Sequence, residues 1–175
     1  MSEIVYLAYG SNLRPLRLRQ RVPSCRVVGV VDRPGFRLAF HKVGMDGSGK
    51  CDLVETGDPE DRAWGVLYSI AASEKPDLDV AEGPGYACLQ RTISYRQQPL
   101  EVMTYLARPE RRDPSQVPFD WYRELVLLGA RHHNLPQSYI GIIEAVTVSE
   151  DPDPERAVQH HRLIEEIRVF GDEPG

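Results

Sequence analysis

The chain has 175 residues, of which 41% are hydrophobic and 27% charged, and its formal net charge is −5. Its length suits one domain with a substantial core, and the composition excludes collagenous, coiled-coil and disordered classes. The acidic balance argues against a nucleic-acid partner, and no apolar run approaches the roughly 18 residues of a membrane span. The charge is uneven, because residues 1–50 hold nine Lys and Arg against three Asp and Glu.

The cysteines and histidines predict neither disulfides nor a metal site. Cys25, Cys51 and Cys88 cannot all pair and lack Cys-x-x-Cys spacing. The His pairs at 132–133 and 160–161 are adjacent, so on a helix their rings diverge and cannot chelate one ion. The residues after Met1 also lack the basic and apolar regions of a secretory signal. We therefore expect a cytoplasmic protein without a metal site.

The chain begins with a strand followed by a polar turn. Ile4–Tyr9 is an apolar run without polar alternation, which is typical of a strand buried on both faces. The run ends abruptly at Gly10, and Asn12 is predicted to cap a short helix that ends before Pro23.

Strands and turns then alternate up to residue 107. The predicted strands are 25–31, 36–40, 51–55, 63–70, 87–96 and 100–107. Asp32-Arg-Pro-Gly separates the first two, and Gln97-Gln98-Pro99 joins the last two into a hairpin. The acidic segment from Ser73 to Glu82 is predicted to be a helix, since Pro76 lies near its start, where proline is tolerated.

The last third is predicted to be helical. Apolar residues recur at helical spacing between Pro118 and Asn134, and 138–148 and 154–169 are two further helices. We expect one domain over residues 1–170 and a frayed tail over 171–175. Because strands come mostly first and helices last, the pattern predicts an α+β fold with a small mixed or antiparallel, barrel-like sheet.

The turn after the first strand is one candidate site. Tyr9-Gly10-Ser11-Asn12 ends a buried strand, and the amides that follow the glycine can bind a carboxylate or an oxyanion. An ordinary strand-to-helix turn explains the same residues. Ser11 lacks the second glycine of a serine-hydrolase elbow, which disfavours that class.

Glu82 is the second candidate. It lies on a mostly apolar segment, directly before Gly83-Pro84-Gly85, and an apolar wall raises the pKa of a carboxyl group toward that of a general base. Composition alone does not select it, because it is one of 26 acidic residues, most of which are solvated.

Four ordered motifs give the sequence a resemblance to the γ-glutamylcyclotransferase family. They are Tyr-Gly-Ser-Asn-Leu at 9–13, Trp-Gly-Val-Leu-Tyr at 64–68, Leu-Asp-x-x-Glu-Gly at 78–83, and Gly-Ala-x-x-x-x-Leu-Pro at 129–136. The resemblance implies a mixed, barrel-like sheet with flanking helices. It also implies an intramolecular reaction without cofactor or metal, in which a γ-glutamyl compound releases its amine and the glutamyl part cyclises to 5-oxoproline.

The resemblance also implies roles for individual residues. Glu82 matches the catalytic glutamate, which would act as general acid and base. The residues that match the substrate-cradling strand end and loop are Tyr6, Leu7, Ala8, Tyr9, Gly10 and Ser11. Tyr86 and Tyr122 match tyrosines that line the pocket, and the amides from Gly10 to Asn12 would hold a substrate oxygen, either of the α-carboxylate or of the developing oxyanion.

We therefore expect a cytoplasmic transferase or lyase of glutathione metabolism. Its partner would be a small γ-glutamyl substrate, with no nucleic acid and no membrane. Apolar positions on the Pro118–Asn134 helix allow a homodimer, although core packing explains them as well. Two alternatives stay open: a cyclotransferase for a γ-glutamyl-amine or a biosynthetic intermediate, and a non-catalytic binder of a small carboxylated metabolite. Catalysis requires Glu82 to face the same cavity as the Gly10–Asn12 turn.

Overall fold

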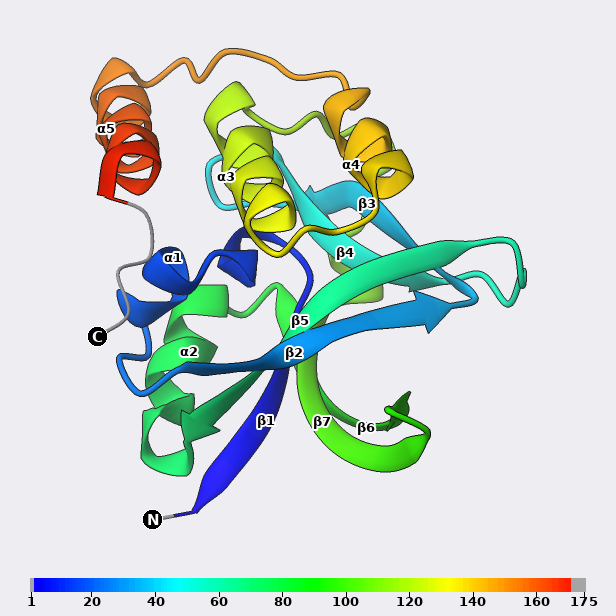
Figure 1. The fold of residues 1–175 in the computed structure, drawn as a ribbon. Coiled ribbons are helices and arrows are strands. Elements are labelled where there is room, and N and C mark those ends of the chain that lie inside the picture. Colours follow the sequence, from blue (N-terminus) through cyan, green and yellow to red (C-terminus); the bar gives the residue numbers. More distant parts are fainter. Residues whose placement is uncertain (1, 171–175) are drawn as a thin grey trace.

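The computed structural model describes residues 2–170 and has the predicted α+β class. The strands are β1 Glu3–Ala8, β2 Arg26–Pro34, β3 Phe36–Val43, β4 Gly49–Glu55, β5 Arg62–Ala71, β6 Tyr86–Tyr95 and β7 Gln98–Ala107. The α-helices are α1 Pro15–Arg19, α2 Lys75–Glu82, α3 Asp120–His132, α4 Gln137–Glu144 and α5 Pro154–Phe170, and the 3-10 helices are η1 Ser11–Leu13, η2 Ala72–Glu74 and η3 Pro109–Arg111. Figure 1 shows α3 and α4 beside the β3–β4 ribbon, with α1 and α2 near the turn that follows β1.

The larger sheet is mixed and has β1 at its centre. Its order is β2-β5-β1-β7-β6, and β3 and β4 form a separate antiparallel pair. β1 runs antiparallel to β5 and parallel to β7. Tyr6 and Ala8 belong to the main core, whereas Leu7 belongs to a smaller cluster with Leu67 and Val102. This two-sided burial confirms the prediction for the first strand and explains its lack of polar residues.

Three local predictions were wrong. η1 follows β1 directly, and the N-cap of α1 is Arg14, so Asn12 does not cap a helix. The turn predicted over Asp32–Gly35 is confined to Gly35, because Asp32, Arg33 and Pro34 belong to β2, which pairs with β5. The predicted β6–β7 hairpin is present, but its turn is centred on Arg96 and Gln97 and not on 97–99, and the φ angles of these two residues, 50° and 64°, suit a two-residue hairpin turn.

Two glycines allow other elements to approach the loop that follows β1. A Cβ on Gly129 of α3 would lie 2.4 Å from Cβ of Leu13 and 2.9 Å from the backbone nitrogen of Arg14. A Cβ on Gly10 would lie 2.9 Å from Cβ of Cys51 in β4. The loop is therefore clamped between α3 and β4, at distances that only glycine permits.

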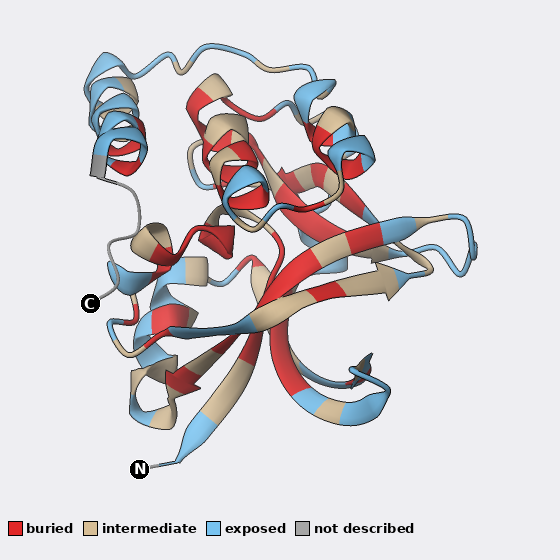
Figure 2. Ribbon diagram, in the orientation of Figure 1, coloured by how far each residue is buried: buried red, intermediate tan, exposed pale blue. Residues whose placement is uncertain are grey.

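Burial follows this arrangement. The inner faces of α3 and α4 and the centre of the sheet are buried, whereas most of α5 is exposed (Figure 2). Among the described helices, none combines the length and apolar character needed to cross a membrane. The boundary of the single domain at residue 170 stays a prediction, as does the homodimer, and the proposed tail at 171–175 lies outside the described residues.

Candidate functional site

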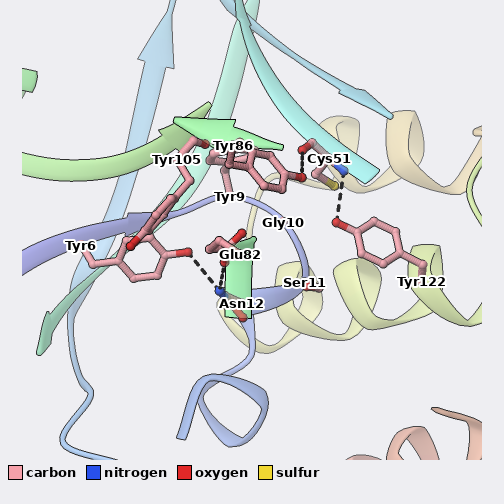
Figure 3. Close-up of a pocket in the computed structure, with 10 residues that line it drawn as sticks. All are labelled: Tyr6, Tyr9, Gly10, Ser11, Asn12, Cys51, Glu82, Tyr86, Tyr105 and Tyr122. Atoms are coloured by element: carbon pink, nitrogen blue, oxygen red, sulfur yellow. Dashed lines mark hydrogen bonds between the residues drawn. The ribbon is translucent and has the colours of Figure 1, made fainter. Parts of the chain in front are cut away.

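A pocket lies at the end of β1, where the following loop meets α2, α3, β4, β6 and β7 (Figure 3). Its lining consists of Tyr6, Tyr9, Gly10, Ser11, Asn12, Cys51, Glu82, Tyr86, Tyr105 and Tyr122. Glu82 and the Gly10–Asn12 turn, which are about 70 residues apart in the sequence, therefore face one cavity. This is the juxtaposition that the catalytic interpretation requires.

The end of α2 places Glu82 in this pocket. Glu82 is the last residue of the helix, and the N–H of Gly83 closes the helix by donating to the carbonyl of Asp79 at 3.0 Å. Gly83 has a φ of 78°, a conformation that L-residues rarely adopt. The glycine turns the chain away immediately after Glu82, whose side chain is only 14% exposed.

Asn12 holds the Glu82 carboxylate in a defined network. Its Nδ2 donates to Oε1 of Glu82 at 2.7 Å and to the Tyr6 hydroxyl at 3.1 Å (Figure 3). Its Oδ1 accepts from Nη1 of Arg21 at 2.9 Å. The same Nη1 lies 3.5 Å from Oε1 of Glu82. Both ends of the Asn12 amide are thus engaged, which fixes the orientation of the side chain.

Burial raises the pKa of Glu82 above its ordinary value. Four groups oppose this effect, in decreasing order: the Arg21 charge, the Asn12 hydrogen bond, and the charges of Lys42 and Arg17. The carboxyl group is therefore a stronger base than a solvated glutamate, while its cationic neighbours limit the increase. This balance suits a group that must accept a proton and then return it near neutral pH.

The pocket tyrosines are neutral hydrogen-bonding groups. Burial raises the pKa of Tyr6, Tyr9, Tyr86, Tyr105 and Tyr122. Three donate to the protein: Tyr9 to the carbonyl of Tyr105, Tyr86 to the carbonyl of Cys51 at 2.6 Å, and Tyr105 to Asp79 at 2.6 Å.

The other two tyrosines act as acceptors. The Tyr6 hydroxyl accepts from Asn12, and the Tyr122 hydroxyl accepts from the Cys51 amide at 3.1 Å. Among residues 2–170, no group accepts the Tyr6 hydroxyl proton in a recorded hydrogen bond. That proton is available to a molecule in the pocket.

The structure brings together most of the predicted site residues. Those that line the pocket are Tyr6, Tyr9, Gly10, Ser11, Asn12, Glu82, Tyr86 and Tyr122. Leu7 and Ala8 do not: the Leu7 side chain packs on the opposite side of the sheet, and Ala8 is buried in the main core. The period of two in a strand requires Leu7 to point away from Tyr6.

Sequence reasoning missed Cys51, Tyr105 and Arg21. Cys51 and Tyr105 lie on strands that were predicted, but no sequence signal brought β4 and β7 to the end of β1. Arg21 follows α1, and the excess of cationic residues over residues 1–50 was a signal that included it without selecting it. Within the described chain, no group of three His, Cys, Asp or Glu side chains is arranged to hold a metal ion.

A larger chamber opens beside the pocket. It has a volume of about 310 Å³ and shares Ser11, Glu82, Tyr86 and Tyr122 with the pocket. Its other polar and aromatic walls come from Arg17, Arg21, Lys42, Asp46, Lys50, Trp121 and His160. Glu82 and Tyr86 therefore lie at the junction between a small inner pocket and a mostly cationic outer chamber.

Known proteins with similar sequences support the resemblance that the motifs indicated. The AIG2-like family model matches residues 62–142. A mouse γ-glutamylcyclotransferase is 28% identical over 154 residues, covering 83% of this chain and 80% of the relative. The γ-glutamyl cyclotransferase aclK of Aspergillus oryzae is 30% identical over 166 residues, covering 79% of this chain and 59% of the relative.

Structural comparison supports the fold. A solved structure described as a γ-glutamyl cyclotransferase superposes with a TM-score of 0.80 at 22% identity, covering 94% of this chain and 99% of that one. At this identity the likeness shows that the two chains share a fold. The predicted mixed sheet with flanking helices is thereby confirmed.

Proposed function

We propose that this chain, which is similar in sequence to γ-glutamylcyclotransferases, is a cyclotransferase that acts on a γ-glutamyl compound, with Glu82 as general acid and base. The observation that carries the proposal is the shared pocket: a buried carboxyl group with a raised pKa faces the turn from Gly10 to Asn12. A binder of a metabolite that carries a carboxylate but no ammonium group would be disfavoured by a second carboxylate in the same pocket, because the two negative charges repel each other.

The first step is removal of a proton from the substrate. An α-amino group has a reference pKa of roughly 8, so near neutral pH it is largely protonated and cannot attack. The Glu82 carboxylate accepts one proton from this ammonium group. The lone pair that is released attacks the γ-carbonyl carbon, and the carbonyl oxygen becomes an oxyanion in a five-membered tetrahedral intermediate.

The second step returns the proton. The intermediate collapses, the carbonyl re-forms, and the bond from the γ-carbon to the leaving nitrogen breaks as Glu82 delivers its proton to that nitrogen. The ring nitrogen still carries a second proton, which passes to the regenerated Glu82 carboxylate and from there to the released amine or to solvent. The products are 5-oxoproline and a free amine. Amides of the Gly10–Asn12 turn and the unshared Tyr6 proton are the donors available to the substrate oxygens.

No separate nucleophile is needed in this scheme. The nucleophile and the electrophile belong to one molecule, so the main tasks of the protein are to select the curled conformer and to move protons from the attacking to the leaving nitrogen. The small inner pocket, which is lined by tyrosines, would hold the glutamyl part of the substrate. The released 5-oxoproline, a role in glutathione metabolism and a cytoplasmic location are parts of this proposal.

The decisive experiment is a screen for 5-oxoproline release from γ-glutamyl amino acids, peptides and amines, using the purified protein and its E82Q variant. We expect release by the wild type and a loss of at least about a hundredfold in E82Q, the usual range for a general acid–base group. The exposed Glu60 provides a matched control, and E60Q should retain activity. Unchanged turnover in E82Q would remove Glu82 from its role, and turnover of no γ-glutamyl compound would contradict the proposed reaction.

A further inference from the structure

The outer chamber is lined by more cationic side chains than take part in the hydrogen-bond network around Glu82. Four cationic side chains line it, Arg17, Arg21, Lys42 and Lys50, against two carboxylates, Asp46 and Glu82. This leaves an excess of two positive charges around one cavity.

Two of the four cations are paired. Arg21 contacts Glu82 and Asn12, as described above. Lys50 donates to Oδ2 of Asp46 at 2.7 Å and to the Ser48 hydroxyl at 2.7 Å.

Lys42 and Arg17 are the other two. Lys42 is 6% exposed, and its ammonium group lies 4.6 Å from the centre of the Tyr86 ring. Among the described residues, no hydrogen bond or ion pair of its ammonium is recorded, and Nε of Arg17 is buried without a hydrogen-bond partner. Burial is the largest of the effects that lower the pKa values of both groups. A buried cation is costly unless an anion compensates it, so these two groups point to an anionic ligand.

The chamber wall contributes shape but no further charge. Trp121 forms one side, and the ring of His160 stacks on it with the centroids 3.6 Å apart. Burial lowers the pKa of His160 to about 4, so this ring is neutral near neutral pH. The anion would therefore contact Lys42 and Arg17, while the remainder of the ligand packs against the Trp121 and Tyr86 rings.

We propose that the chamber receives the amine side of the substrate, and that Lys42 and Arg17 bind a carboxylate on that leaving group. This inference rests on the proposed function. Because Glu82 lines both cavities, a scissile bond at their junction would place the leaving nitrogen beside its proton donor and the leaving-group carboxylate in the chamber. The preferred substrates would then be γ-glutamyl amino acids or peptides, and γ-glutamyl amines without a carboxylate would be poor.

The test compares two substrates that differ only in this charge, γ-glutamyl-alanine and γ-glutamyl-alaninamide. For the wild type we expect kcat/KM to favour the acid by at least about tenfold. In K42Q the ratio of the two kcat/KM values should fall by about tenfold, to near one, mainly through KM of the acid, which is the size expected for loss of a charge-assisted hydrogen bond. R17Q should act in the same direction.

The controls separate charge recognition from other effects. K42R should retain most of the preference, and R19Q, which removes an exposed charge from the same helix as Arg17, should leave the ratio unchanged. Lys42 also influences the pKa of Glu82, so all rates should be measured on the pH plateau. A change in Glu82 alone would affect both substrates equally and would leave the ratio constant.

The outcomes distinguish this inference from the proposed function. Equal turnover of the acid and the amide by the wild type would overturn the carboxylate site and leave the cyclotransferase intact, as would an unaltered ratio in both K42Q and R17Q. If neither these two compounds nor any other γ-glutamyl compound in the screen is turned over, the proposed function fails. Calorimetric binding of the acid and the amide to E82Q then decides the inference, because equal affinities would refute it.

Discussion

The R21Q variant tests whether Arg21 lowers the pKa of Glu82 and thereby sets the pH range in which the proposed general acid and base is active. Arg21 is the largest of the influences that lower the pKa of Glu82, and it is half of the clamp that holds Asn12. Replacing the guanidinium with a neutral amide removes the strongest effect that opposes the increase in the pKa of Glu82 caused by burial. The pKa of Glu82 should therefore rise further above its ordinary value.

The size of the shift follows from the contact. The two charged atoms are 3.5 Å apart, and the side chains of Arg21 and Glu82 are 20% and 14% exposed. Coulomb's law at an effective dielectric constant of about 20 gives an upper bound of roughly 5 kcal/mol at this distance. Solvent access, counter-ions and the residual hydrogen bond from Asn12 reduce it to about 1.4 kcal/mol, which corresponds to about one pKa unit.

The assay is the pH profile of kcat/KM for 5-oxoproline release. In the proposed mechanism Glu82 must be deprotonated, so the acidic limb should move to higher pH by about one unit in R21Q. At pH values below the wild-type limb, kcat/KM of R21Q should be about tenfold lower than that of the wild type. The difference should disappear on the plateau, where Glu82 is deprotonated in both proteins. R19Q removes the same charge from an exposed neighbouring position and should not move the limb. An acidic limb at the wild-type position in R21Q, with a uniform loss at every pH, would refute the reasoning and assign Arg21 to substrate binding.

Three further predictions follow from the packing and the ionisation of the site. G129A should destabilise the protein by about 1–3 kcal/mol in chemical denaturation and raise KM, because the new methyl group would overlap Leu13 in the loop. The control is G141A: Gly141 lies in open space on another helix, so this substitution should be neutral or stabilising. E82Q should unfold at a higher temperature than the wild type above neutral pH and at the same temperature near pH 4. Because the pKa of Glu82 is raised in the folded state, the wild type has its full stability below the unfolded-state pKa and loses stability as pH rises through the folded-state pKa. A stability difference between E82Q and the wild type that grows toward acidic pH would contradict the assigned direction of the pKa shift. Y6F keeps the ring but removes the unshared proton, and it should lower kcat/KM by about tenfold without moving the acidic limb by more than a few tenths of a unit; full activity would show that the substrate does not use this donor.

The sequence predicted local structure well where the signal was local. Apolar spacing and the positions of glycine and proline made three elements recognisable: β1, the helix that ends at Glu82, and α3. The motif at 129–136 contains Gly129, but only packing explains why that residue is a glycine: α3 crosses the loop too closely for any side chain. Leu7 was predicted to contact the substrate because it belongs to the run that matches the substrate-cradling strand end. Side chains alternate between the two sides of a sheet, however, so Leu7 points away from the pocket.

The role of Asn12 could not be read from its neighbours. Before a run of helix formers, an asparagine is an ordinary N-cap, and that local interpretation was wrong because stronger partners lie far away in the sequence. Its amide joins Glu82 and Arg21, and the fold brings these residues together only when β1 lies at the centre of the sheet and α2 ends beside it.

What the sequence by itself determined was the set of elements, the resemblance to a family of cyclotransferases, and a shortlist that contained Glu82 and the turn after β1. The tertiary structure decided which shortlisted residues share a cavity, which cations face that cavity, and which of them are already paired. The reason is physical. Helices, strands and turns depend on neighbours a few residues apart, whereas pKa values, hydrogen-bond partners and the shape of a pocket depend on groups that meet only when distant segments pack together.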